Sequence, residues 1–544
     1  MNTNAATLEA AHTPAQIRPR LDYKAGPATT IIFVGLLAAG LLYTAYSLMS
    51  DVTSAGVPTL SIAPFILLGV ALLIALGFEF VNGFHDTANA VATVIYTHSL
   101  PPHLAVLWSG ACNFLGVLAS SGAVAFGIIS LLPVELILQV GSSAGFAMVF
   151  ALLIAAILWN LGTWWLGLPA SSSHTLIGSI VGVGIANALM HGRNGTSGVD
   201  WAQVTKIGES LLLSPLVGFL AAGLLLLALR VVIKNRKLFE APKSNAPPPW
   251  WIRGILVLTC TGVSFAHGSN DGQKGMGLIM LILVGTVPLA YALNRAMPAD
   301  QVTQFVATAH LTQQSLTGNL AGAAATGASI DQTRSILSDY VRTRQFHPEV
   351  LAALADMAGS IGAQVGGTHQ SLARVPAAAV PNVRNDMYLA SEAIRLMQKD
   401  ATVKLDAAAT GNLKTFKKQI DAATKFIPLW VKVVVAIALG LGTMVGWKRI
   451  VVTVGEKIGK SHLTYAQGAS AEVVAMLTIA AADSFGLPVS TTHVLSSGVA
   501  GTMAANGSGL QMATVRNLLL AWVMTLPAAI ILSGSLYWLF SRLF

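Results

Sequence analysis

The chain has 544 residues, of which 54% are hydrophobic and only 10% are charged, and its mean hydropathy is +0.66. This composition excludes an ordinary soluble globular protein and indicates a chain that lies in lipid. The formal net charge of +9 would suit a nucleic-acid binder, but the basic residues gather in loops near residues 234–253 and 448–460. Such loop cations orient membrane proteins and meet anionic lipid, so we expect membrane lipid and no nucleic acid as a partner.

Apolar runs long enough to cross a bilayer recur along the chain. They must be helical within lipid, because backbone groups there have no water to bond, and they predict an all-α polytopic protein with about ten to twelve transmembrane helices or half-helices. The runs lie near residues 32–50, 60–80, 104–130, 144–165, 175–190, 210–233, 251–265, 278–293, 427–447, 465–482, 493–506 and 515–541.

Two pairs of similar segments divide the chain into related halves. Phe80–Ala90 aligns without gaps with Phe265–Gly275, and Gly167–His174 aligns with Gly486–His493. The second pair is farther apart because the second half contains a long hydrophilic insert. The predicted organisation is a polar N-terminal tail (1–30), a first transmembrane repeat with a leading helix (31–233), a basic loop (234–250), the start of a second repeat (251–293), the insert (294–426) and the remainder of the second repeat (427–544).

The two Gly-Leu-Pro sequences, at 167–169 and 486–488, interrupt their helices, since proline has no amide donor and clashes with the preceding turn. The hydroxyl run after each one predicts a helix that begins inside the membrane with Ser or Thr at its cap. We expect each half to supply one acid-bearing helix break and one hydroxyl-bearing helix start, with the cargo between the halves. The tail is expected to be cytoplasmic and uncleaved. We also place the insert in the cytoplasm, although the basic 448–460 loop argues against that side.

The hydroxyl motifs suit an anion. A helix start aims free amides and a positive dipole end outward, and the six residues Ser171, Ser172, Ser173, Ser490, Thr491 and Thr492 add hydroxyl donors to two such starts. Donors from both halves could enclose a tetrahedral phosphate. The alternative is that these hydroxyls only bond their own backbone or join helices, but their duplication beside a helix break favours the anion site.

Asp86 and Asp271 are the acids of the first motif pair, and a carboxylate inside a bilayer is costly enough to indicate function. Asn89 and Lys274 lie one helical turn beyond them. Asp271 could instead only neutralise Lys274. Two carboxylates and a phosphate repel one another in a low dielectric, so cations must accompany the anion as protons, Na⁺ or a divalent metal such as Mg²⁺ or Ca²⁺. His85 could relay protons or simply pack as a neutral ring. The sequence does not decide whether Glu79 and Glu472 line an ion path or only pack within the protein.

On these motifs the chain resembles the Pit family of bacterial low-affinity inorganic phosphate transporters. The resemblance implies two inverted repeats in the bacterial inner membrane that import phosphate by alternating access. Members of that family are generally driven by protons and take phosphate as a neutral metal–phosphate complex. The residues expected to bind substrate are Asp86, Asn89, Ser171, Ser172, Ser173, Asp271, Lys274, Ser490, Thr491 and Thr492, and those expected to couple cations or protons are His85, Asp86, Asn270 and Asp271.

One departure bears on the coupling ion: His85 and Lys274 replace two neutral oxygen ligands of sodium-coupled relatives, which favours H⁺. The expected protein is therefore a proton-coupled phosphate symporter and not an enzyme, with no resident cofactor or metal, because the metal travels with its cargo. Alternatives are a Na⁺-coupled symporter, a phosphate-sensing receptor that signals through the insert, and sulfate or arsenate as cargo. A homodimer is a further open possibility. A hydrolase built on His85, Asp86, His174 and Asp271 has no metal-ligand spacing to support it.

Overall fold

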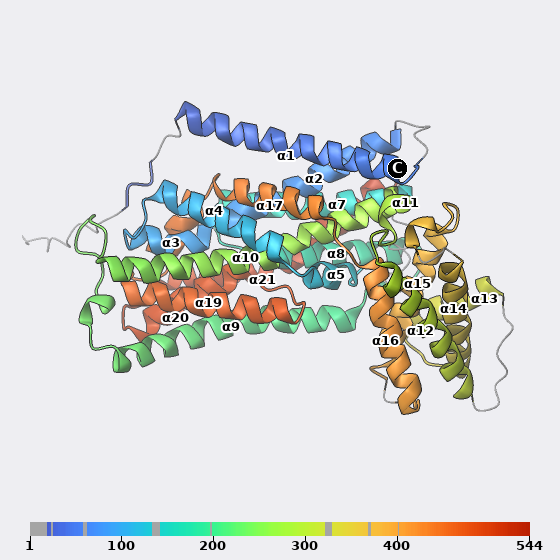
Figure 1. Ribbon diagram of the computed structural model, residues 1–544. Helices are drawn as coiled ribbons and strands as arrows, with labels where there is room; N and C mark the ends of the chain where they lie inside the picture. Colours follow the sequence, from blue (N-terminus) through green and yellow to red (C-terminus); the bar gives the residue numbers. More distant parts are fainter. Residues whose placement is uncertain are drawn as a thin grey trace, which may run out of the picture.

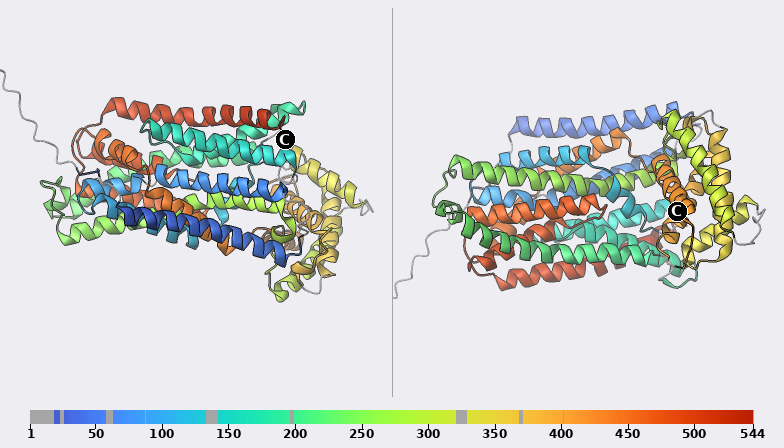
Figure 2. Two further views of the ribbon diagram at one scale, coloured as in Figure 1. Left: turned by 90° about the horizontal axis from the view of Figure 1, so that it is seen from above. Right: turned by 60° about the horizontal axis from the view of Figure 1, so that its bottom comes forward.

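Figure 1 shows the computed structural model as a bundle of long helices that lie side by side, with a cluster of shorter helices packed across one end. The structure describes residues 19–22, 26–57, 63–86, 88–132, 142–195, 199–320, 329–367, 371–400 and 402–543. All the elements named in these residues are helical, as the apolar runs predict. The cluster at the end of the bundle is the hydrophilic insert, and the views in Figure 2 place it at the same end.

The first half supplies the leading helix and a set of helices that pack against those of the second half. Its helices are α1 (Pro27–Ser54), α2 (Ala63–Asp86), α3 (Ala88–Tyr96), α4 (Pro102–Ala119), α5 (Ala123–Ile129), α7 (Ser143–Trp165), α8 (Ser172–Met190) and α9 (Trp201–Val232). The second half supplies α10 (Trp250–Thr286), α11 (Pro288–Tyr291), α17 (Leu429–Thr443), α18 (Lys448–Val452), α19 (Tyr465–Ser484), α20 (Thr491–Ala505) and α21 (Met512–Phe540).

By length and composition, seven helices in the described residues could cross a membrane, and an eighth span is added if α16 and α17 are taken as one pair bent by 68°. The helices α10, α19 and α20 also lie along the bundle in Figure 1. α20 has only 15 residues, and α10 carries the polar second acidic motif through its middle. The architecture is therefore an all-α polytopic membrane protein.

Glycines at matched positions show that the two halves pack on each other in the same way. A methyl group added at Gly83 of α2 would collide with the Leu439 carbonyl of α17, and one added at Gly268 of α10 would collide with the Asn113 carbonyl of α4. Because Gly83 and Gly268 are equivalent in the repeated motif, α2 meets α17 as α10 meets α4. Small residues allow this close approach of helices in membranes. The acid-bearing helix of each repeat therefore packs against a helix of the other repeat.

The two repeats are inverted with respect to each other. α1 ends beside the insert end of the bundle, where the Tyr291 hydroxyl donates to Asp51 Oδ2 at 2.7 Å and Arg295 donates to the Ser54 carbonyl at 3.2 Å. α2 therefore begins near that end and runs away from it, whereas α10 starts at the opposite end and runs toward the insert (Figure 1). The prediction of inverted repeats agrees with these directions.

Residues 19–22, the described part of the N-terminal tail before Gly26, lie at the end of the bundle opposite the insert. Asp22 of the tail meets Lys448 at 3.4 Å, in the basic loop region far from the insert. A membrane crossed by the bundle would separate the two, so the expectations that both are cytoplasmic cannot hold together.

The insert is a separate helical layer with its own apolar core. Its helices are α12 (Ala299–Gly318), α13 (Ile330–Thr343), α14 (Pro348–Gly366), α15 (Val380–Met397) and α16 (Ala407–Thr424). Phe305, Leu354 and Phe416 are fully buried within this layer. Asp200, which caps α9 through the Gln203 N–H at 2.9 Å, pairs with Arg344 and Arg395 of the insert. These ion pairs tie the insert to the membrane bundle.

Candidate functional site

Both Gly-Leu-Pro motifs break the chain inside the bundle, as predicted. α7 ends at Trp165 and α8 begins at Ser172, with Gly167 between them at a φ of +67°. In the second half, Gly486 has a φ of +64° between α19 and α20. This left-handed conformation favours glycine, which explains the residue that precedes Leu-Pro in both copies.

Serines cap both new helices. Ser171 accepts the His174 N–H at 3.2 Å, and Ser490 accepts the His493 N–H at 3.2 Å. Their hydroxyls therefore satisfy amides of their own helices in this conformation, which is the alternative role that the sequence left open.

The two helix starts face each other from opposite repeats. The Ser173 hydroxyl of α8 donates to the Val489 carbonyl, just before α20, at 2.9 Å. The rings of His174 and His493 lie 4.6 Å apart between centroids, and His493 stacks on Trp522 at 4.1 Å. Residues distant in sequence thus form one site at the junction of the repeats.

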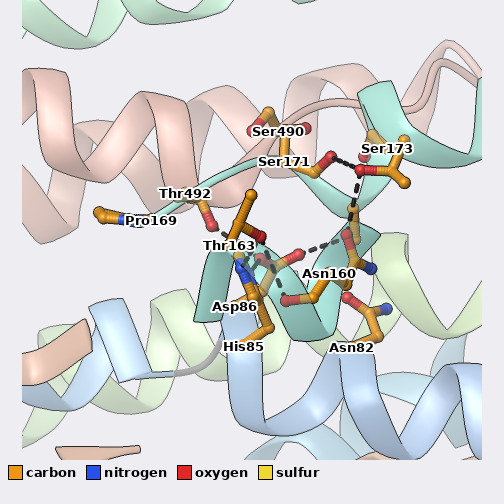
Figure 3. A network of polar contacts seen from close by, with 12 residues as sticks. Asn82, His85, Asp86, Asn160, Thr163, Pro169, Ser171, Ser173, Ser490 and Thr492 are labelled. Atoms are coloured by element: carbon orange, nitrogen blue, oxygen red, sulfur yellow. Dashed lines mark hydrogen bonds and ion pairs between the residues drawn. The ribbon is translucent and has the colours of Figure 1, made fainter. Parts of the chain in front are cut away.

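Asp86 lies at the centre of this junction, at the last residue of α2 (Figure 3). Its carboxylate accepts hydrogen bonds from the Ser172 hydroxyl of α8 and from the Thr492 hydroxyl of α20, the latter at 2.8 Å. His85 Nδ1 lies 2.9 Å from Asp86 Oδ1, and His85 Nε2 lies 3.1 Å from the Thr163 hydroxyl. Both hydroxyl motifs therefore reach the same acid.

The second acidic motif lies within a continuous helix. α10 runs from Trp250 to Thr286 through Gly268–Gly275, so the expectation of a helix break at this motif is wrong. Lys274 Nζ lies 2.7 Å from Asp271 Oδ2 and 3.3 Å from the Ser172 hydroxyl. Both charged side chains are fully buried. The helix can stay regular here because one turn separates Asp271 from Lys274, and the pair neutralises itself along the helix face.

A cation could bind between the two acids. Ligand atoms of Asp86, His267 and Asp271 all lie within 4.8 Å of one another, and all three side chains are buried. His267 Nδ1 lies 3.0 Å from Asn113 Oδ1, a contact that leaves Nε2 facing Asp271 at 3.4 Å. Two carboxylates and one imidazole form a ligand set that suits a divalent metal. Sequence reasoning missed His267, although its position one helical turn before Asp271 was a usable signal.

The other predicted residues have varied positions. Asn270 holds the loop before α20, because its Nδ2 donates to the Leu487 carbonyl at 3.1 Å and its Oδ1 accepts the Val489 N–H at 3.3 Å. The Thr491 hydroxyl is buried and has no hydrogen-bond partner in the described part of the chain. The side chain of Asn89 lies outside the described residues. The site thus brings together Asp86, Ser172, Thr492, Asp271 and Lys274.

Comparison with known proteins identifies the family of this chain. Residues 82–533 match the model of the family described as the phosphate transporter family. The chain is 42% identical to the low-affinity inorganic phosphate transporters PitB and PitA of Escherichia coli K12, covering 87% of this chain and 97% of each relative. A solved structure named the sodium-dependent phosphate transporter aligns over 88% of this chain and 100% of its own, with 19% identity and a TM-score of 0.49. The chain therefore belongs to the phosphate transporter family, as a multi-pass protein of the bacterial inner membrane.

Proposed function

We propose that the protein is a secondary active symporter that imports inorganic phosphate together with cations by alternating access between its two repeats. The observation that carries this proposal is the buried junction where Asp86 of one repeat accepts hydrogen bonds from Ser172 and from Thr492 of the other repeat. A site made from both repeats changes whenever the repeats move relative to each other. That coupling is what alternating access requires.

The charge of the junction supports cation-coupled transport. Asp86 and Asp271 contribute two negative charges and Lys274 one positive charge, so the site carries about −1 if its histidines are neutral. Addition of HPO₄²⁻ alone would bring the total to about −3 in a buried, low-dielectric site. A divalent cation entering with HPO₄²⁻ leaves the charge unchanged. We therefore favour a neutral metal–phosphate complex as the cargo, with the metal at Asp86, His267 and Asp271.

Protons are the favoured driving ion. The group that could hold a cation beside Asp271 includes the imidazole nitrogen of His267, whereas a sodium-binding site would need neutral oxygen ligands. Coupling to Na⁺ is the alternative. In sodium-free medium, a proton-coupled transporter should still take up phosphate, whereas a Na⁺-coupled transporter should not.

The basic end of the bundle is proposed to face the cytoplasm. Lys/Arg residues in short loops set the orientation of membrane proteins, whereas long inserts have little influence. The basic segments 234–253 and 448–460, which the structure shows to be short and partly helical, lie at the end away from the insert. The insert would then face the periplasm, and phosphate would enter from its side.

Uptake in proteoliposomes tests this function. We expect labelled phosphate to enter faster with an inward proton gradient and Mg²⁺, without a requirement for Na⁺. Asp271→Asn should abolish uptake, because Lys274 would then be a buried charge without its partner. Wild-type protein that carries no phosphate would refute the function. An Asp271→Asn variant with normal uptake would refute only the site.

A further inference from the structure

A third acid, Glu79, lies near the junction without a role in the binding site. It belongs to α2, seven residues before Asp86, and therefore lies about two helical turns away on the same face. Its side chain is fully buried, with 0% of its surface exposed. Because α2 runs from the insert end toward Asp86, Glu79 lies on the insert side of the substrate site.

Glu79 makes a direct contact between the two repeats. Its Oε1 accepts the backbone N–H of Gly275, on α10, at 2.6 Å. Gly275 directly follows Lys274, and a methyl group added there would collide with the Glu79 side chain. The contact therefore depends on glycine at this position. Any motion that separates α2 from α10 on the insert side must break it.

Glu79 differs from the other two acids of this region in having no cation. Asp86 contacts His85 and Asp271 contacts Lys274, but no Lys, Arg or His nitrogen in the described residues forms an ion pair with Glu79. The charged groups that act on it from α10 are Lys274 and Asp271. Their opposite charges largely cancel because they are paired. A buried carboxylate without a cation is far less stable than the neutral acid, which favours the protonated form of Glu79 in this structure.

Asn82 can serve both protonation states of Glu79. Its Nδ2 lies 3.4 Å from Glu79 Oε2, while its Oδ1 is buried without a hydrogen-bond partner in the described residues. The nitrogen can donate to a carboxylate. If the amide turns over, its oxygen can instead accept the O–H of the protonated acid, and the two amide orientations are nearly equivalent in shape.

We propose that Glu79 carries the proton that is coupled to phosphate import. This role rests on the proposed symport. When the insert side opens, Glu79 loses its contact with Gly275 and takes one proton from external water onto Oε2. The neutral acid then fits its buried position beside Gly275, where no cation is paired with it in the described residues. After the other side opens and phosphate leaves, the proton passes to internal water and the carboxylate forms again.

Separate assays of exchange and net transport test the proposal with Glu79→Gln. Glutamine keeps the acceptor for the Gly275 N–H and resembles the protonated acid. We expect Glu79→Gln to exchange labelled for unlabelled phosphate within about twofold of wild type, since exchange needs no net proton movement. Net uptake should lose its response to pH. One pH unit supports about tenfold accumulation for one proton per phosphate, and the variant should lose this accumulation.

The matched control is Asp51→Asn, which changes a carboxyl in α1 that bonds Tyr291 and Trp430 away from the site. It should retain proton-driven accumulation. Glu79→Asp should retain part of it. Proton-driven accumulation by Glu79→Gln at the wild-type level would overturn the proposal. Loss of exchange by Glu79→Gln, in protein that is still monodisperse, would also overturn it, because Glu79 would then be required for phosphate translocation itself.

A spectroscopic measurement covers the case in which Glu79→Gln does not fold. Infrared spectra of wild-type protein labelled with ¹³C-glutamate should contain the carbonyl stretch of a protonated glutamic acid, and Glu79→Asp should lower its intensity by the share of one residue. Absence of that band from wild type would overturn the proposal. Wild-type protein without any phosphate uptake would instead refute the underlying function, so the two failures are distinguishable.

Discussion

Thr492 of the second repeat donates its hydroxyl to Asp86 of the first repeat at 2.8 Å, across 406 positions of the chain. Ser172 donates to the other oxygen of the same carboxylate. Asp86 is thus held by one hydroxyl from each helix start. Its position depends on both repeats, which makes it sensitive to their relative motion.

Thr492→Val should impair transport with little effect on folding. Valine keeps the shape of threonine but cannot donate to Asp86, and a hydrogen bond to a charged group is worth about 1.5–3 kcal/mol. We expect the ratio of maximal rate to KM for phosphate uptake to fall roughly tenfold or more. Thr502→Val is the control, since among the described residues that hydroxyl donates to the Val499 carbonyl of its own helix. Equal uptake by the two variants would contradict the role of Thr492.

His267→Gln should weaken the use of divalent metal. His267 Nε2 faces Asp271 within the possible metal site, whereas His310 lies exposed on the insert. We expect the Mg²⁺ or Mn²⁺ concentration for half-maximal uptake to rise on the order of tenfold for His267→Gln, which corresponds to about 1.4 kcal/mol. His310→Gln should leave it unchanged. A chelator should stop uptake by the wild type, and uptake that persists without divalent metal would exclude a metal–phosphate cargo.

Gly83→Ala should destabilise the protein, and Gly69→Ala should not. Both glycines belong to α2, but a methyl group at Gly83 meets the Leu439 carbonyl and one at Gly69 meets open space. Overpacking costs roughly 1–3 kcal/mol or more, whereas alanine in place of an unconstrained helical glycine gains up to about 1 kcal/mol. Melting temperatures in detergent check this difference. A stable Gly83→Ala variant would mean that α2 and α17 do not pack as described.

Acid should loosen the attachment of the insert. Burial alone would raise the pKa of Asp200, but the hydrogen bond from Gln203 and the charges of Arg344 and Arg395 outweigh it and lower the pKa below its usual value. A carboxyl with a lowered pKa stabilises the folded state fully above its unfolded pKa of about 4, and this stabilisation fades as the pH falls toward the folded pKa.

Hydrogen exchange measures the acid effect directly. Protection at the start of α9 should be constant above about pH 5 and should fall below about pH 4 in the wild type. Asp200→Asn should show weaker protection at neutral pH and less change on acidification. A wild-type profile identical to that of Asp200→Asn would show that these ion pairs do not hold the insert.

Cysteine labelling decides which end of the bundle faces outward. Gln304 on the insert and Ser244 in the basic loop are both exposed, and the native Cys112 and Cys260 are buried. In intact spheroplasts, a membrane-impermeant thiol reagent should label Gln304→Cys. Ser244→Cys should react only after permeabilisation. The reverse pattern would overturn the proposed orientation, and labelling of both from one side would contradict the bundle as a membrane-spanning unit.

The sequence by itself determined the all-helical membrane class, the two repeats and the presence of a helix start with a Ser or Thr cap after each Gly-Leu-Pro motif. These follow from local physics, because apolar runs must be helical in lipid and proline after Gly-Leu cannot continue a helix. The same local rules identified Asp86 and Asp271 as acids inside the bilayer, where a carboxylate is costly and therefore indicates function. These local rules did not show that α10 continues through its acidic motif. In the sequence, a polar stretch inside an apolar run predicts a helix break, whereas in the structure Asp271 and Lys274 neutralise each other and the helix stays regular.

Only the tertiary structure decided which groups share the site. Ser172, Thr492 and Asp86 come from three distant segments, and their meeting depends on two inverted repeats that pack on each other through Gly83 and Gly268. Glu79 had no recognisable partner in the sequence, because its partner is the backbone N–H of Gly275, and every residue but proline carries one. Side-chain identity encodes the chemistry of each group, but the packing of the repeats sets which groups face one another.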